Sequence, residues 1–367
     1  MTVCISEMIR KIGQHFQQYP FIHGGSGVII QINFHRKIIS EITEKSLLTF
    51  VRMLGKITKA HGLLHFIVFI WGWSPILGRA IDAQALQLVW FRILITLLAL
   101  IVYFIFIREN LKTDRKTGLI LAGIGGVISF HWFCFYNGIK VSNVSVTLVG
   151  FSTGTIFTSL IEPFFYKRKI ILYELFFGAV IIFAIGLIMW EDLTRVNTPD
   201  SEPKTKVDFG LGIFYGALAA FTSSLFTVWN GMLVRKVKST MITFYELSGG
   251  IVCLSVFLLL NGNFTGKENF FSISSHDYYY LGILAVVGTA FPFIASTNLL
   301  KKISPYTMTL TVNLETVYGI LLAAILFKEY EQLTGLFYFS TCLILLVIVG
   351  NAAFKNHLEN KKAHQKN

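Results

Sequence analysis

Long apolar runs alternate with short polar segments from residue 63 to residue 354. About 20 residues of helix cross the hydrocarbon core of a bilayer, and all but the first run, at 19 residues, reach that length. The predicted spans are 63–81, 86–107, 117–138, 142–166, 170–190, 209–231, 240–261, 278–300, 304–327 and 333–354. The pattern therefore predicts an all-α polytopic membrane protein with ten transmembrane helices.

The composition agrees with this interpretation. Of the 367 residues, 54% are hydrophobic and only 14% are charged, whereas about a quarter of the residues in soluble domains are charged. The net charge of +12 would suit a nucleic-acid partner, but the basic residues form short clusters between apolar runs, so we expect none. The four cysteines have no CxxC spacing, so we expect no metal, cofactor or disulfide set.

The loop charges predict the orientation of the spans. With the N-terminus inside, 24 Lys and Arg residues fall on the inner side, 7 fall on the outer side, and Arg92 lies within a span. Cytoplasmic loops of membrane proteins carry an excess of Lys and Arg. We therefore expect the protein to lie in the cytoplasmic (inner) membrane, with both termini in the cytoplasm.

The segments outside the spans give the remaining organisation. We expect residues 1–62 to be a basic, poorly ordered N-terminal extension, with Met53 as the true start; an ordered cytoplasmic helix near 36–60 is the alternative. The polar segment 191–208 is expected to be an outer loop between two halves, 63–190 and 209–354. Residues 355–367 are expected to form a cytoplasmic tail.

The two halves resemble each other in sequence. YNGIKVSNVSVTLVGFSTG follows span 3, and TNLLKKISPYTMTLTVNLET follows span 8. Aligning Asn137 with Asn298 and Lys140 with Lys301 places Thr153 near Glu315. Because each half has five spans, the second half must be inserted upside down, as in transporters built from inverted repeats with a substrate site near the midplane.

Four stretches carry a resemblance to a known family: WGWSPILGRA (71–80), VWFRIL (89–94), SLIEPFFYKRKI (159–170) and NLETVYGILLAAILFKE (313–329). Over residues 63–354 the chain resembles the drug/metabolite transporter superfamily, EamA type. That resemblance implies a ten-helix carrier of small metabolites, proton- or gradient-linked and often an exporter. The chain departs from the family pattern in two places: Thr316 follows Glu315 where Pro is usual, and the equivalent FSTGT (151–155) has no Pro.

Glu315 is the strongest candidate for a functional residue. It is the twelfth of the 24 residues of span 304–327, close to Asn313. A carboxylate at membrane depth costs about 2.5–3.5 kcal/mol on insertion scales, so it needs a partner, a proton or a water-filled cavity. We expect a proton-coupling or substrate site here. The alternative is a structural carboxylate that is hydrogen-bonded to a neighbouring helix.

Two more ionisable residues lie seven positions into their spans. Arg92 in span 2 could bind an anionic group of a substrate, or it could reach the outer interface or form a packing ion pair. Glu246 in span 7 is its counterpart in the second half, and it could gate the inner side or play a structural role beside Arg235.

The remaining candidates are aromatic or small and polar. Trp71, Trp73 and Ser74 surround Gly72 and Pro75 at the middle of span 1, where we expect a cavity wall; packing against lipid is the alternative for the tryptophans. His131 could relay protons or simply donate to another helix. Thr153 belongs to a polar patch in span 4 that we expect to support the site. Glu162 is expected at the inner interface and Glu329 in a solvated turn.

These features favour a secondary transporter that moves small amino-acid-like, drug-like or related polar and amphipathic compounds by alternating access. The sequence has no GxxxxGK[ST] loop for ATP, so the energy must come from an ion gradient or from the substrate's own gradient. Export coupled to a proton gradient is expected. Spans 5 and 10 hold few polar residues, so we expect them at the periphery, against lipid or in a homodimer. A membrane-embedded enzyme is an alternative, without an HExxH or GxSxG motif to support it, and a non-transporting sensor or scaffold is another.

Overall fold

The part of the chain that the structure describes is helical, with no strand. The structure is a computed structural model, and it describes residues 59–196, 208–264, 270–329 and 333–364. The expectations for residues 1–58 and 197–207 lie outside these ranges. Residues 59–62, expected in the N-terminal extension, already belong to the first described helix, and residues 355–364 continue the last helix.

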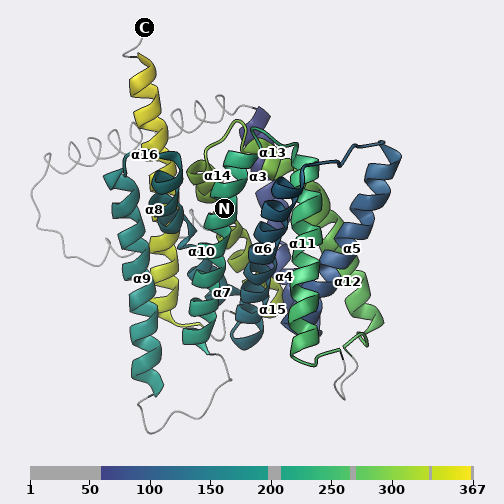
Figure 1. Cartoon of the computed structure of the whole chain (residues 1–367). Helices are drawn as coiled ribbons and strands as arrows, with labels where there is room; N and C mark the ends of the chain where they lie inside the picture. The colour runs from purple at the N-terminus through teal and green to yellow at the C-terminus, as the bar shows by residue number, and fades with distance from the viewer. Residues whose placement is uncertain (1–58, 197–207, 265–269, 330–332, 365–367) are drawn as a thin grey trace, which may run out of the picture. The chain divides into compact units, whose positions relative to one another are not determined.

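The helices run side by side, and several of them are interrupted (Figure 1). In chain order they are α3 (Lys59–Trp71), α4 (Ser74–Ala80), α5 (Ala85–Phe106), α6 (Arg115–Val141), α7 (Val144–Phe151), α8 (Gly154–Tyr166), α9 (Leu172–Val196), α10 (Phe209–Leu233), α11 (Ser239–Leu260), α12 (Ser275–Ala285), the π-helical turn η1 (Val286–Ala290), α13 (Phe291–Leu299), α14 (Pro305–Val312), α15 (Leu314–Phe327) and α16 (Gly335–His364).

Nine helices in the described residues are long and apolar enough to cross a membrane. They are Lys59–Ala80, Ala85–Phe106, Arg115–Val141, Val144–Tyr166, Leu172–Trp190, Phe209–Leu233, Ser239–Leu260, Ser275–Leu299 and Pro305–Phe327. Each matches one of the first nine predicted spans, and the largest difference is at the first, which begins at residue 59 rather than 63. The prediction of an all-helical, polytopic membrane protein is confirmed.

Helix α16 stands at the position of the tenth predicted span, but its apolar part, Gly335–Asn351, is shorter than the other nine. It packs lengthwise against α9 (Figure 1). The ring of Phe354 on α16 lies 5.1 Å from that of Tyr173 and 6.4 Å from that of Phe177, both on α9.

Large apolar side chains cover the outward faces of the helices. Phe106 is 89% exposed and Phe164 80% exposed, whereas Phe104, two residues before Phe106, is 2% exposed. Such faces are unfavourable in water and suit contact with lipid. The exposed residues therefore give the membrane assignment a structural basis beyond the hydropathy of the helices.

Several helices begin at a residue whose side chain caps the first turn. Asp114, Asn143, Asp208, Ser274 and Ser304 each accept a hydrogen bond from the backbone N–H three residues later. Such caps satisfy N–H groups that have no partner within the helix. Asn143 and Ser304 occupy corresponding places, at the starts of α7 and α14.

The fourth and ninth spans are broken at matching positions, although neither has Pro at the break. Ser152 and Thr153 separate α7 from α8, and their hydroxyls donate to the carbonyls of Val149 (2.6 Å) and Gly150 (2.7 Å). Side chains that bond to nearby backbone in this way compete with helical hydrogen bonds. Asn313 alone separates α14 from α15.

The two breaks lie against each other and satisfy each other's backbone. The Asn313 side-chain amide donates to the Ser152 carbonyl at 3.1 Å. The Thr316 hydroxyl donates to the Leu148 carbonyl at 3.3 Å. Interrupted membrane helices need neighbours that pair the freed backbone groups. Thr316, where the resembling family usually has Pro, thus holds the two broken helices together.

Two buried carboxylates join the ends of these broken spans. Glu162 on α8 accepts from the Tyr306 N–H at the start of α14 (2.9 Å) and lies 3.4 Å from the Arg168 Nε. Partial burial lowers the pKa of Arg168, but the carboxylates of Glu162 and Glu174 outweigh it, and the net shift is upward. Glu162 is 4% exposed, so its carboxylate is buried among these partners rather than directed at solvent.

Glu329 plays the corresponding role at the opposite end. Its carboxylate accepts from the N–H groups of Val144 (3.1 Å) and Ser145 (3.0 Å) and from the Ser145 hydroxyl (2.7 Å). Its side chain is 2% exposed, so the expectation of a solvated turn is wrong. A carboxylate at a helix N-terminus is also favoured by the helix dipole.

The Glu329→Ala variant is expected to lose about 3 kcal/mol of unfolding free energy, because two buried N–H groups at the start of α7 lose their acceptor. Unfolding of the purified protein by a denaturing detergent measures the loss. Glu109→Ala is the control, since Glu109 pairs with the exposed Lys238 at 2.8 Å and such surface pairs contribute about 0–1 kcal/mol. Equal losses in the two variants would contradict the capping role.

Candidate functional site

A cavity of about 90 Å³ lies among the interrupted helices. Its walls come from α3, α5, α6, α7, α10, η1, α13, α14 and α15, which belong to both predicted halves. The lining residues are Trp71, Arg92, His131, Trp132, Phe135, Phe151, Ser223, Phe226, Thr227, Asn230, Gly288, Thr289, Phe293, Ser296, Thr297, Leu300, Met308, Val312 and Glu315. The cavity thus combines a cation, an acid and an aromatic lining.

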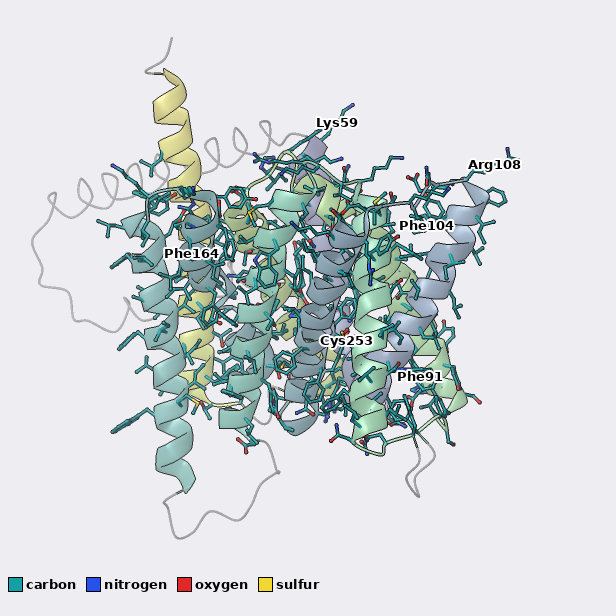
Figure 2. The ribbon with its side chains drawn as sticks, in the orientation of Figure 1. Lys59, Phe91, Phe104, Arg108, Phe164 and Cys253 are labelled. Atoms are coloured by element: carbon teal, nitrogen blue, oxygen red, sulfur yellow. The ribbon has the colours of Figure 1, made fainter. Side chains whose placement is uncertain are left out.

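The cavity extends toward one end of the helices. Asn230, Leu300 and Met308 lie close to the end of α10, the end of α13 and the start of α14. Lys59 at the start of α3 and Arg108 just after α5 lie together at one end of the helices, and Phe91 lies toward the other (Figure 2). By chain direction, α10 and α13 finish, and α14 begins, at the end where α3 begins and α5 finishes.

Three neighbours hold Arg92 in this cavity. Its Nε donates to the Thr289 hydroxyl at 2.9 Å, and its Nη1 donates to the Tyr136 hydroxyl at 2.6 Å. Its guanidinium carbon lies 4.2 Å from the centre of the Trp132 ring, in cation–π contact. At 3% exposure it does not reach the outer interface, which was one of the alternatives for it.

The π-helical turn η1 positions Thr289. The Thr289 hydroxyl also donates to the Leu284 carbonyl at 2.8 Å, and the Trp71 indole donates to the Gly288 carbonyl at 3.1 Å. Thr96 donates to the Ala285 carbonyl at 3.1 Å. Irregular turns inside helices often occur at functional sites, because they free backbone groups and turn side chains inward.

Glu315 lies just after the break between α14 and α15 and lines the same cavity. It is 6% exposed, and in the described part of the chain its carboxylate has no hydrogen-bond partner. Its charge interacts through space with that of Arg92, but no ion pair joins the two groups. The carboxylate is therefore directed at the cavity rather than bound to a neighbouring helix.

Aromatic rings form much of the remaining wall. His131 donates from Nδ1 to the Ala219 carbonyl at 2.8 Å, so it is an interhelical donor as well as a lining residue. The ring of Phe226 lies edge-on to His131, with centroids 5.4 Å apart. Phe293 lies 5.9 Å from Trp132. Such rings can hold the apolar body of a ligand or stabilise a cation.

The structure brings four of the sequence candidates together at the cavity wall, namely Trp71, Arg92, His131 and Glu315. Trp73 is 39% exposed and does not line it. The Ser74 hydroxyl lies 2.8 Å from that of Tyr136, behind Arg92.

Thr153 and Asn313 lie at the helix breaks and support the wall from outside. Glu246 lies behind Asn230, whose side-chain amide donates to it at 3.3 Å.

Several residues of the site were missed from the sequence. Tyr136 and Thr289 hold Arg92, yet Thr289 is 197 positions away in sequence and carries no local signal. A helical pattern could have found Tyr136, because it lies four residues after Trp132 and therefore on the same face of α6. Asn230, near the end of α10, also lines the cavity without a local signal in the sequence.

Comparison with known proteins assigns the chain to a family. The model of the EamA-like transporter family matches residues 58–190 and again residues 210–352, one match in each predicted half. The chain belongs to the EamA-like transporter family. The sequence-based resemblance is thereby confirmed, and with it the assignment to a family of membrane transporters.

A relative and a solved structure agree with this assignment. An uncharacterized transporter of Archaeoglobus fulgidus is 24% identical over 242 residues, which cover 64% of this chain and 78% of the relative. A crystal structure of a protein matches 79% of this chain and 95% of its own, with 12% identity and a TM-score of 0.56. The likeness to the crystal structure shows a similar fold and nothing more. Both the family and the relative are described as transporters.

Proposed function

We propose that this EamA-family protein is a secondary transporter that exports small amphipathic metabolites through alternating access of the cavity. The single observation that carries the proposal is the cavity itself. It lies where interrupted helices from both halves meet. It holds Arg92 and Glu315, which are both buried and whose charges interact. Charged side chains inside a membrane domain mark substrate or ion pathways.

The proposed arrangement is ten spans as two inverted five-helix repeats, with both termini in the cytoplasm. Helix α16 is the tenth span, and its packing along α9 supports this. The matched breaks of α7/α8 and α14/α15 support the repeat, as do the left-handed lysines after each, Lys167 (φ 51°) and Lys328 (φ 52°). The excess of basic residues on one side supports the orientation.

In this orientation the cavity extends toward the cytoplasm. Asn230, Leu300 and Met308 then lie at its cytoplasmic side, and the hydrogen-bonded group of Ser74, Tyr136 and Arg92 closes the outer side. The structure therefore corresponds to the inward-facing member of an alternating pair. A transporter of this class opens the same site to the other side when one repeat rocks against the other.

The chemistry of the cavity favours a compound with both charges and an apolar body. Arg92 suits a carboxylate, Glu315 suits an ammonium group or a proton, and the rings of Trp132, Phe226 and Phe293 suit an apolar side group. Glu315 would exchange a proton for the ammonium group, so that proton entry drives export of the compound.

Vesicles containing the purified protein test the proposal. They are loaded with a panel of amphipathic compounds that carry a carboxylate, an ammonium group, both or neither, and efflux is followed with and without an inward proton gradient. We expect efflux of the compounds with both charges, faster with the gradient, and chemically unchanged compound outside. Chemical conversion without movement would favour a membrane-embedded enzyme, and neither conversion nor movement for any compound would contradict the proposal.

A further inference from the structure

Beside the cavity lies a second group of buried oxygen atoms that the proposed transport cycle does not use. Glu246 is fully buried on α11, and its Oε1 has no hydrogen-bond partner in the described residues. The Oδ1 of Asn230 on α10 and the hydroxyl of Thr243 on α11 also have none. Buried polar atoms in native structures are nearly always paired, so three such oxygens in one place indicate a missing partner.

Asn230 and Glu246 are in contact, and Thr243 lies on the same helix face as Glu246. The Asn230 amide nitrogen lies 3.3 Å from Oε2 of Glu246, which brings the Asn230 side chain against the carboxylate. Thr243 precedes Glu246 by three residues, so both lie on the same face of α11. Thr243 is fully buried as well, and Asn230 is 2% exposed.

Among the described residues, no cation neutralises this carboxylate. Its surroundings contribute burial and the Asn230 hydrogen bond, and no charged neighbour. Helix α6 packs on α11 with Gly125 against the backbone carbonyl of Glu246, and α13 carries no titratable residue. Helix α5 contributes Arg92, whose guanidinium is already bound to Thr289 and Tyr136. An isolated buried carboxylate is too costly to persist as a free anion, so a bound cation or a proton must neutralise it.

We propose that Glu246, Asn230 and Thr243 form a binding site for a monovalent cation, either a proton or Na⁺, that is separate from Glu315. The unpaired atoms are all oxygens, the ligand type that a hard cation prefers. Asn230 also lines the cavity, so the ion has an entry path from it. A coupling role for the ion rests on the proposed transport function, whereas its binding does not.

Infrared difference spectroscopy on the full-length protein in lipid nanodiscs tests the site without any substrate. Spectra are compared between acidic and alkaline pH, and at constant pH between NaCl and choline chloride. We expect a protonated-carboxyl band of the wild type that Glu246→Gln lacks. Loss of that band with alkali alone identifies a proton site, and loss on adding NaCl identifies a Na⁺ site.

Two further variants separate ion binding from a merely structural role. Asn230→Ala is expected to shift the midpoint of the carboxyl response by about tenfold in ion concentration, which is what a hydrogen bond to a charged group is worth. Thr243→Val keeps the shape of the side chain, and is expected to weaken a Na⁺ response while leaving a proton response in place. Glu246→Asp retains a carboxyl group and replaces Glu246→Gln if that variant does not fold.

The inference is overturned if wild type and Glu246→Gln give the same difference spectra under both changes, because Glu246 would then exchange neither ion. A failure of the proposed transport function has a different signature. In that case the vesicles show no efflux, while the Glu246 band still responds to pH or NaCl.

Discussion

The Arg92→Gln variant is expected to export carboxylate-bearing compounds about 100-fold more slowly than the wild type. Removing one partner from a buried charged network costs about 3–5 kcal/mol, and 1.4 kcal/mol corresponds to a factor of ten, so 100-fold is a conservative expectation. The buried guanidinium donates to Thr289 and Tyr136 and stacks on Trp132. Glutamine can replace at most one of these contacts and carries no charge for a carboxylate.

Arg92→Lys separates charge from geometry. Lysine retains the charge, but its single ammonium group cannot reproduce the fork that reaches both Thr289 and Tyr136. We therefore expect export by Arg92→Lys to fall well below that of the wild type, and Arg79→Gln, which removes an exposed arginine, to leave it unchanged. Initial efflux rates from vesicles measure all three variants. Wild-type rates in Arg92→Gln would contradict an anion-binding role for this residue.

The Gly125→Ala variant is expected to lose about 3 kcal/mol of unfolding free energy, at the upper end of what overpacking costs. A Cβ at Gly125 would stand 1.8 Å from the Glu246 carbonyl oxygen and 2.6 Å from its carbon. These are backbone atoms, so no side-chain rotation relieves the overlap, and α6 and α11 would have to separate. Small residues allow such close approach between membrane helices.

Gly123→Ala is a matched control on the same helix. Nothing lies within 4 Å of a Cβ at Gly123, so its unfolding free energy is expected to change by no more than about 0.5 kcal/mol. Gly126→Ala should fall between them, because its Cβ would meet the flexible Cys253 side chain at 3.2 Å. Unfolding by a denaturing detergent measures all three. A loss in Gly123→Ala as large as that in Gly125→Ala would contradict the close contact of α6 with α11.

The spans could be predicted from the sequence because the bilayer imposes length and apolarity on every crossing helix. The ionisable candidates followed from the same constraint, since Arg92 and Glu315 are expensive wherever the surroundings are apolar. That reasoning requires no knowledge of neighbours. It is also why the sequence could name these residues without saying that they share a cavity.

The contacts between distant segments could not be predicted in this way. Glu162 and Glu329 lie near helix ends, where a carboxylate is usually solvated, yet each caps a helix that begins more than 140 residues away in sequence. The turn η1 is followed by Pro292, which signals an irregularity in the span but does not reveal the contacts that Gly288 and Thr289 make with other helices. Trp71 and Trp73 differ by two positions, and the interruption between α3 and α4 places one at the cavity and leaves the other exposed.

The position of Thr316 also shows what depends on tertiary structure. Because Pro is absent, no local pattern predicts a break near Glu315 or in FSTGT. The breaks form because Ser152, Thr153, Asn313 and Thr316 supply hydrogen bonds to the backbone that a continuous helix would have used itself. Such exchange of partners is visible only when both helices are in place.

The most direct test of the central claim, that Glu315 couples proton movement to export, is proton flux into vesicles in response to an exported compound. A pH-sensitive dye inside the vesicles reports the flux for wild type, for Glu315→Gln and for the control Glu109→Gln. We predict compound-dependent acidification in the wild type and in Glu109→Gln, and none in Glu315→Gln, although that variant still exchanges labelled compound across the membrane. Full proton flux in Glu315→Gln would contradict the claim.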